Sequence, residues 1–277
     1  MKSNLAILSS DKKSINFIQN LNLNKFCNLY ANCSRNVNVA EKFSKEHNFT
    51  KYYGSYEELL DDQNIDCLIN FLPPGIKFEY TYLFLKKKIK VITDYPVIST
   101  ANELDYFEEI IKKDLISNLF LIDNLDYANF YKKTSNHKYI TYHKKIKKNQ
   151  DLDNSLSTAD ILFELSPDLF FFINKYKKSN IKVKVFDKIN DKITNKINFL
   201  RCLIIIDNSI KLHVTIDNSH TDNSHISYGI DNPNEIKDSI FNKESLINFI
   251  NSKKPFDNLS DFQYYPFKLF QEVLINE

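Results

Sequence analysis

Short apolar runs alternate with amphipathic stretches from residue 1 to residue 123. Each run has the length of a buried strand, and the stretch that follows it repeats its apolar residues at helical spacing. The runs lie at residues 5–8, 28–33, 67–72, 90–93 and 119–122, with a further short strand expected at the tyrosines before Gly54. Strands joined by helices in this order form parallel βαβ units, so the pattern predicts a doubly wound parallel sheet.

The segment from Asp66 to Pro96 shows this pattern most clearly. A strand closes at Pro73-Pro74-Gly75, which no helix interior would tolerate, and a helix follows that ends in three lysines before the next strand. In an open parallel sheet, ligands bind beyond the carboxyl ends of the strands. Those ends are expected at Leu72-Pro73-Pro74 and at Asp94-Tyr95-Pro96, which makes both tripeptides candidates for a ligand site.

The pattern changes after Asp123. An apolar helix is expected at residues 161–176, followed by strands with few helices between them and by closing helices at residues 246–250 and 264–275. The strands are expected at residues 181–186, 198–206, 210–216 and 225–230, with a further alternating stretch around residue 140. This order predicts an α+β domain with a large, mostly antiparallel sheet, open on one face. We therefore expect one domain at residues 1–123 and a second at residues 124–277.

Composition narrows the classes of function. The formal charge is +2 and the lysines are mixed among acidic residues, so no basic face for nucleic acid is expected. No apolar stretch has membrane-spanning length, and no signal segment opens the chain, which disfavours a membrane or secreted protein. The 4 cysteines stand far apart and resemble buried reduced thiols, which fits a cytoplasmic location.

Glycine and arginine are scarce, with 3 Gly and only Arg35 and Arg201 as arginines, whereas Asn, Lys and Ile are abundant. This composition indicates an A+T-rich coding sequence. Glycine or arginine positions can therefore have been lost by drift rather than by a change of function. Whatever the origin of the loss, the chemistry that those residues supplied is absent.

Several motifs in this order resemble one enzyme family. Residues 40–46 (AEKFSKE), 53–60 (YGSYEELL) and Ile65-Asp66 are similar to the AExFAxExG, YxSYEELL and ID segments of the Gfo/Idh/MocA family, named after glucose-fructose oxidoreductase and inositol dehydrogenase. Residues 246–274 resemble the C-terminal segment of that family, so the match covers most of the chain. The resemblance implies a Rossmann-like N-terminal domain, a nicotinamide cofactor and a sugar-like small-molecule substrate.

The cofactor-binding segments depart from the family pattern. The family has a glycine-rich turn after its first strand, whereas this chain has a turn that begins Ser9-Ser10-Asp11, and the Asp11 carboxylate would repel a diphosphate. Ser34-Arg35 ends the second strand, where a basic residue suits the 2′-phosphate of NADP, although a solvated arginine is an equal alternative. NADP or NAD is expected if any cofactor binds, and no cofactor at all is an open alternative. The candidate contacts are Ser9, Ser10, Asp11, Ser34, Arg35, Leu72, Pro73, Pro74 and Asp94.

The catalytic motifs also depart from the family pattern. The resemblance aligns Asp94-Tyr95-Pro96 with the family's Glu-Lys-Pro, so Tyr95 replaces the catalytic lysine and cannot supply its positive charge. Glu164 and Asp168 correspond to the Asp-x-x-x-His helix motif, with an acid in place of the imidazole. Tyr95, Glu164 and Asp168 are the catalytic candidates, and Lys77, Tyr95 and Asp168 are the candidates for substrate binding. The alternatives are a buried aromatic side chain for Tyr95 and helix capping for the two acids.

No metal site is expected. His213, His220 and His225 have Asp217 and Asp222 between them, but their spacing fits no compact ligand motif and their surroundings are typical of a hairpin. Solvated turn residues are the preferred interpretation.

Three functions remain open. The first is a divergent homologue with weak or lost NAD(P)-dependent activity on a sugar-like molecule. The second is an active NADP-dependent reductase or dehydrogenase of a sugar or another small carbonyl compound. The third is a non-catalytic binding or assembly subunit. The resemblance also implies a homodimer or tetramer built through the open face of the C-terminal sheet, on which Ile204 and Ile206 are expected to lie.

Overall fold

The computed structural model describes residues 2–98, 100–122, 138–147, 167–190, 197–220, 225–228, 233–234, 243–252 and 264–275. The chain divides into two compact units. The first contains Met1–Val97, Asp105–Ile122 and Phe241–Asp261, and the second contains Ile98–Leu104, Asp123–Ile240 and Phe262–Glu277. No helix in the described segments combines the length and the apolar character needed to cross a lipid bilayer.

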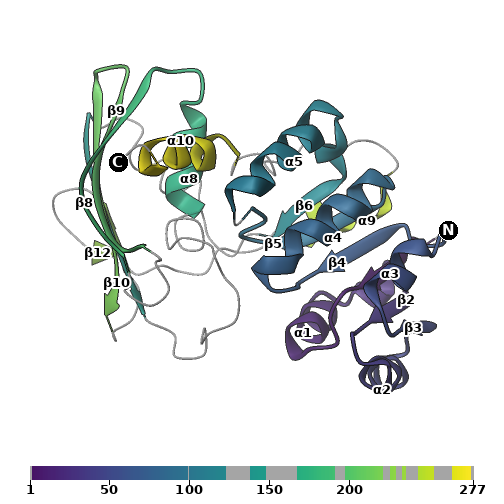
Figure 1. The fold of residues 1–277 in the computed structure, drawn as a ribbon. Coiled ribbons are helices and arrows are strands. Elements are labelled where there is room, and N and C mark those ends of the chain that lie inside the picture. The colour runs from purple at the N-terminus through teal and green to yellow at the C-terminus, as the bar shows by residue number, and fades with distance from the viewer. Residues whose placement is uncertain are drawn as a thin grey trace. The chain divides into compact units, whose positions relative to one another are not determined.

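The first unit is built on a six-stranded parallel sheet of order β3-β2-β1-β4-β5-β6 (Figure 1). The strands are β1 (Asn4–Ile7), β2 (Asn28–Cys33), β3 (Lys51–Tyr53), β4 (Cys67–Asn70), β5 (Lys90–Asp94) and β6 (Leu119–Ile122). The helices between them are α1 (Lys12–Leu21), α2 (Val37–His47), α3 (Tyr56–Asp61), α4 (Pro74–Lys86) and α5 (Ala101–Lys112), with short 3-10 turns at Leu23–Lys25 and Leu115–Asn118. The strand order reverses between β1 and β4, which confirms the predicted doubly wound fold.

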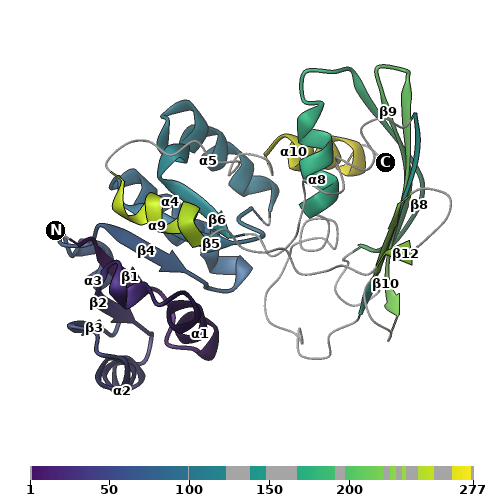
Figure 2. The same cartoon turned by 180° about the vertical axis from the view of Figure 1, so that it is seen from behind.

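Helix α9 (Lys243–Asn251) packs on this first sheet (Figure 2), although the sequence placed it in a second domain at residues 124–277. Its apolar residues Leu246, Phe249 and Ile250 are buried in one core with residues of β1, β4 and β5. A single domain boundary at residue 123 therefore separates this helix from the sheet on which it packs. Sequence pattern alone shows that a helix has an apolar face, but it does not show which sheet covers that face.

Lys90, the first residue of β5, holds the C-terminal end of α9. Its ammonium group donates to the carbonyl oxygens of Phe249 at 2.6 Å and Ile250 at 3.1 Å, and also to that of Ser252. Terminal carbonyl groups lack partners within their own helix, and a cation at this end also interacts favourably with the helix dipole. Burial lowers the pKa of Lys90.

The second unit contains a six-stranded sheet of order β12-β11-β7-β10-β9-β8. Its strands are β7 (Tyr139–Lys147), β8 (Ile181–Asn190), β9 (Ile197–Ile206), β10 (Ile210–His220), β11 (His225–Tyr228) and β12 (Pro233–Asn234). The pairs are antiparallel except for β10 with β7, so the expected mostly antiparallel sheet is confirmed. Helices α8 (Pro167–Lys175) and α10 (Tyr264–Ile275) lie on one side of this sheet (Figure 1), where Phe170 stacks on Phe270.

The expected position of Ile204 and Ile206 on the open face is wrong, because both side chains are buried. Ile204 pairs with Leu212 in β10, and these residues face the covered side of the sheet, whereas Leu203 and Ile205 face the other side and are half-buried. Residues 203–206 are all apolar, so alternation within β9 could not identify the covered face. The neighbouring strand decides it, since Lys211 and His213 alternate with the buried Leu212 and Val214.

We predict that Lys90→Met lowers the free energy of unfolding by about 1–3 kcal/mol, because carbonyl groups at the end of α9 lose their partner. Denaturant unfolding would measure this difference. Lys45→Met is the matched control, since Lys45 forms an exposed pair with Glu41 one turn away and its loss should leave stability nearly unchanged. Equal stability of the two variants would contradict the anchoring role of Lys90.

Candidate functional site

The two predicted tripeptides lie at the carboxyl edge of the first sheet. Leu72-Pro73-Pro74 runs from the end of β4 into α4, and Asp94-Tyr95-Pro96 ends β5. Strands β4 and β5 are neighbours, with Asn70 paired to Thr93 in the last register position. The structure thus brings the two tripeptides together beside the point between β1 and β4 where the strand order reverses, which is the usual ligand position in such sheets.

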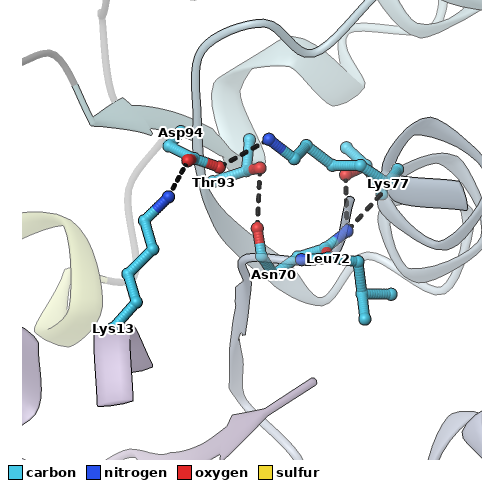
Figure 3. A network of polar contacts seen from close by, with 7 residues as sticks. Lys13, Asn70, Leu72, Lys77, Thr93 and Asp94 are labelled. Carbon is cyan, nitrogen blue, oxygen red and sulfur yellow. Dashed lines mark hydrogen bonds and ion pairs between the residues drawn. The ribbon is translucent and has the colours of Figure 1, made fainter. Parts of the chain in front are cut away.

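Asn70 fixes the backbone at this edge through four hydrogen bonds (Figure 3). Its side-chain nitrogen donates to Lys77 O at 2.9 Å and Thr81 Oγ1 at 3.0 Å, and its side-chain oxygen accepts from the Leu72 amide. The hydroxyl of Thr93 donates to the Asn70 carbonyl at 2.8 Å. Sequence analysis missed Asn70, although a polar residue inside the apolar run at residues 67–72 is a recognisable signal for such a role, and the structure buries it fully.

Three charged side chains meet at the end of β5 (Figure 3). Lys77 Nζ lies 2.6 Å from Asp94 Oδ1, and Lys13 Nζ forms an ion pair with Asp94 Oδ2. The side chain of Lys77 is 3% exposed, that of Asp94 18% and that of Lys13 56%. Sequence analysis proposed Lys77 for substrate and Asp94 for cofactor, but it did not anticipate that they contact each other. It missed Lys13, because no spacing rule predicts an ion pair between residues so far apart in the chain.

The turn after β1 is closed by its own side chains. The Asp11 carboxylate caps α1 by accepting a hydrogen bond from the Ser14 amide at 2.8 Å. The Ser10 hydroxyl donates to Asn32 Oδ1 at 2.6 Å, and the Asn32 amide group donates in turn to α2 at Ala40 O. The α1 N-terminus, where a glycine-rich turn would leave backbone amides open to an anion, is therefore already satisfied in part by a carboxylate.

Ser34 and Arg35 follow β2 as expected, and Arg35 is exposed. Its guanidinium group lies beside the phenol of Tyr56 in α3. Burial raises the pKa of Tyr56, and the positive charge of Arg35 opposes that rise. Asn36 caps α2, so the next helix N-terminus is satisfied by a side chain as well.

The predicted catalytic residues are not all in one described place. Tyr95 follows β5, with its hydroxyl buried, in the same unit as Lys77 and Asp94. Glu164 lies outside the described residues, and Asp168 belongs to the first turn of α8 in the second unit. Their catalytic roles therefore remain predictions. Among the described residues, no group of three or more His, Cys, Asp or Glu side chains could hold a metal ion.

The Rossmann-like geometry agrees with the comparisons with known proteins. Residues 11–115 match the sequence model of the Gfo/Idh/MocA family, described as "Oxidoreductase family, NAD-binding Rossmann fold". Over these residues the chain is similar to the Gfo/Idh/MocA family. Family and fold are those of NAD(P)-binding oxidoreductases.

Solved structures of family-like proteins are similar over the whole length. A myo-inositol 2-dehydrogenase from Lactobacillus plantarum is 14% identical with a TM-score of 0.70, covering 100% of this chain and 98% of that one. The WlbA dehydrogenase from Bordetella pertussis, solved with NADH and UDP-GlcNAcA, is 10% identical with a TM-score of 0.73 and the same coverage. A probable dehydrogenase from Thermotoga maritima is 13% identical with a TM-score of 0.70, covering 99% and 97%. At these identities, the likeness establishes the fold alone.

Within the Gfo/Idh/MocA family framework, the residues present fit a dinucleotide poorly at its diphosphate. Asp11 places a carboxylate at the α1 N-terminus, and the Ser10 side chain is bonded across to β2. A positive charge is nevertheless present at the end of β5. It is carried by Lys77 from α4 and faces Asp94, whereas position 95 holds a neutral phenol.

We predict that Asp94→Ala lowers the free energy of unfolding by about 3 kcal/mol, because it leaves the buried ammonium of Lys77 without its carboxylate. Lys13→Met removes the exposed partner of the same carboxylate and should have a much smaller effect. Thermal and denaturant unfolding of both variants would measure the contrast. A reversed order of the two effects would contradict the assignment of Lys77 as the buried partner.

Proposed function

We propose that this protein is a divergent Gfo/Idh/MocA homologue that binds a sugar-like small molecule and has weak or lost NAD(P)-dependent activity. The observation that carries the proposal is the Asp11 carboxylate at the N-terminus of α1. A helix N-terminus favours anions through its free amides and its dipole. Here one of those amides already has an anionic partner within the chain.

The energetic consequence for a dinucleotide is unfavourable. Two like charges about 4 Å apart repel by roughly 4 kcal/mol near a protein surface. Rotating Asp11 away to avoid that repulsion would remove the helix cap, at a cost of about 1 kcal/mol. We therefore expect dissociation constants of ~0.1–1 mM or weaker for either nicotinamide dinucleotide.

The predicted catalytic residues support the same conclusion. The phenol of Tyr95 can donate a proton but carries no positive charge, and the nearby ammonium of Lys77 is engaged by Asp94. In this proposal Tyr95 and Lys77 contact the ligand at the end of β5, and the catalytic roles of Glu164 and Asp168 stay predictions from the family resemblance. A sugar-like ligand is supported by two structural neighbours, whose names refer to an inositol and to a nucleotide sugar.

An active NADP-dependent reductase or dehydrogenase is the second candidate. It is supported by Arg35, which is exposed immediately after β2 and carries a permanent positive charge suited to a 2′-phosphate. Tight binding of NADPH with a clear preference over NADH would favour this candidate.

We predict that the wild-type protein binds NADPH and NADH at ~0.1 mM or weaker, and that Asp11→Asn binds both at least ~5-fold more tightly. Asparagine keeps the N-cap and removes only the charge, so a gain reports repulsion rather than a change in helix stability. Fluorescence titration of the nicotinamide would measure both constants. Asp105→Asn, on α5, is a charge-matched control that should leave affinity unchanged. Micromolar binding by the wild type would overturn the proposal.

The proposal includes a homodimer, or a tetramer made from dimers, assembled through the open face of the second sheet. The apolar residues on that face include Leu203 and Ile205 on β9, and Tyr139 on β7 and Phe186 and Ile189 on β8 expose 69%, 45% and 59% of their surface. Lys182, Lys184 and Lys211 lie on the same face, since they pair with Ile205, Leu203 and Ile205. Exposed apolar side chains favour association, and a two-fold arrangement would cover them on both copies.

The proposal also includes a cytoplasmic location, which fits the four free, buried cysteines. Burial raises the pKa of one of these thiols, that of Cys27, to about 11.

We predict that light scattering at low micromolar concentration gives the mass of a dimer or tetramer, with an interface of at least ~1,000 Å². The double variant Leu203→Lys, Ile205→Lys should dissociate it, because two charges would have to be buried in the interface. Tyr106→Lys, at an exposed aromatic residue on α5, is the control and should keep the wild-type mass. A monomeric wild type would contradict the assembly.

A further inference from the structure

We propose that Lys13 admits an anionic small molecule to the crevice at the end of β4, by exchanging the Asp94 carboxylate for a carboxylate or monophosphate on the ligand. This inference rests on the proposed function, in which the carboxyl edge of the first sheet binds a sugar-like molecule. It adds that the preferred ligand carries one compact negative group, and it names the residue that selects for that group.

The Lys13 side chain crosses the place where a ligand would enter. Lys13 is in the first turn of α1, immediately after β1, and its partner Asp94 ends β5. Strand β4 lies between β1 and β5 in the sheet. The ammonium of Lys13 lies 5.1 Å from the centre of the Phe71 ring, just beyond the end of β4. The Lys13–Asp94 ion pair therefore links the first turn of α1 to the end of β5, beside the point where the strand order reverses (Figure 3).

The two ion pairs of Asp94 differ in how easily they open. Lys77 is 3% exposed, so breaking its pair would leave a buried charge without its partner, which is costly. Lys13 is 56% exposed, and exposed ion pairs contribute little net free energy. Lys13 is thus the partner that can leave, while Lys77 keeps Asp94 neutralised in place.

Opening the crevice changes its charge in a way that selects the ligand. With Lys13 released, two ammonium groups face one carboxylate, which leaves one positive charge to be matched. An anionic ligand group can take the place of Asp94 in a charge-assisted hydrogen bond, whereas a neutral sugar must break the ion pair without replacing it. The predicted preference is therefore for anions.

Asp11 limits the size of the anionic group that can bind at this turn. Its carboxylate lies at the α1 N-terminus, two residues before Lys13, and is directed to the Ser14 amide. A diphosphate extended along this turn would meet that carboxylate, whereas a single carboxylate or monophosphate at Lys13 need not reach it. The same turn can therefore exclude a dinucleotide and still accept a sugar acid or a sugar phosphate.

Isothermal titration of the full chain with glucuronate, glucose 6-phosphate, inorganic phosphate and neutral glucose tests the inference. The wild type should bind at least one of the two anionic sugars ~10-fold more tightly than glucose, as expected for one charge-assisted contact. Lys13→Gln should lose that preference and bind glucose at least as well as the wild type. Lys12→Gln removes a neighbouring exposed lysine and should keep the preference. Weaker binding of inorganic phosphate than of glucose 6-phosphate would show that the sugar is also recognised.

The outcomes separate the inference from the function on which it rests. If glucose and the anionic sugars bind equally well and Lys13→Gln changes neither affinity, the role of Lys13 is rejected while the sugar-like ligand stands. If Lys12→Gln weakens the anions as much as Lys13→Gln does, the effect is general electrostatic attraction and the inference fails. If no sugar binds to the wild type or the variants, the proposed function fails as well.

Discussion

A buried ammonium group is the constraint on which this edge of the molecule depends. Lys77 lies inside the protein and needs a carboxylate partner, and Asp94 supplies it from the end of the neighbouring strand. The two can meet only if α4 begins directly after β4 and if β4 and β5 keep their register. Asn70 provides both conditions, since it bonds to the first turns of α4 and accepts a hydrogen bond from Thr93 on β5. The site geometry is thus set by polar groups that cannot be left unpaired.

This chain has the fold of the family, whereas the residues of its phosphate turn depart from the family pattern. The sheet order and the position of the crevice follow from apolar packing, which many side chains can satisfy. Binding a diphosphate depends instead on a few positions where backbone amides must be open, and here Asp11 and Ser10 engage the turn internally. A chain can therefore keep this scaffold while the residues of its phosphate turn depart from the family pattern.

Much of the fold could be predicted from sequence because apolar periodicity reflects burial directly. The six parallel strands and the two tripeptides at their carboxyl ends were expected where they lie. What could not be predicted depends on contacts between distant segments. The apolar run at residues 203–206 gave no indication of which face is covered, and the docking of α9 depends on Lys90, far away in the chain. The ion pair between Lys13 and Asp94 also joins segments that are far apart in the chain, so the sequence pattern did not predict it.

The scarcity of glycine affects folding and ligand chemistry differently. Asn22 and Asn48 end α1 and α2 in the left-handed conformation, with φ of 52° and 59°, where glycine is the usual residue. Asparagine adopts this conformation at modest cost, so a gene drifting toward A+T can exchange one for the other. At Gly54 the constraint is steric, because an added Cβ would lie 3.0 Å from that of Val37, which would have to shift to make room. Mutational drift in base composition can thus erode ligand recognition long before it endangers the architecture.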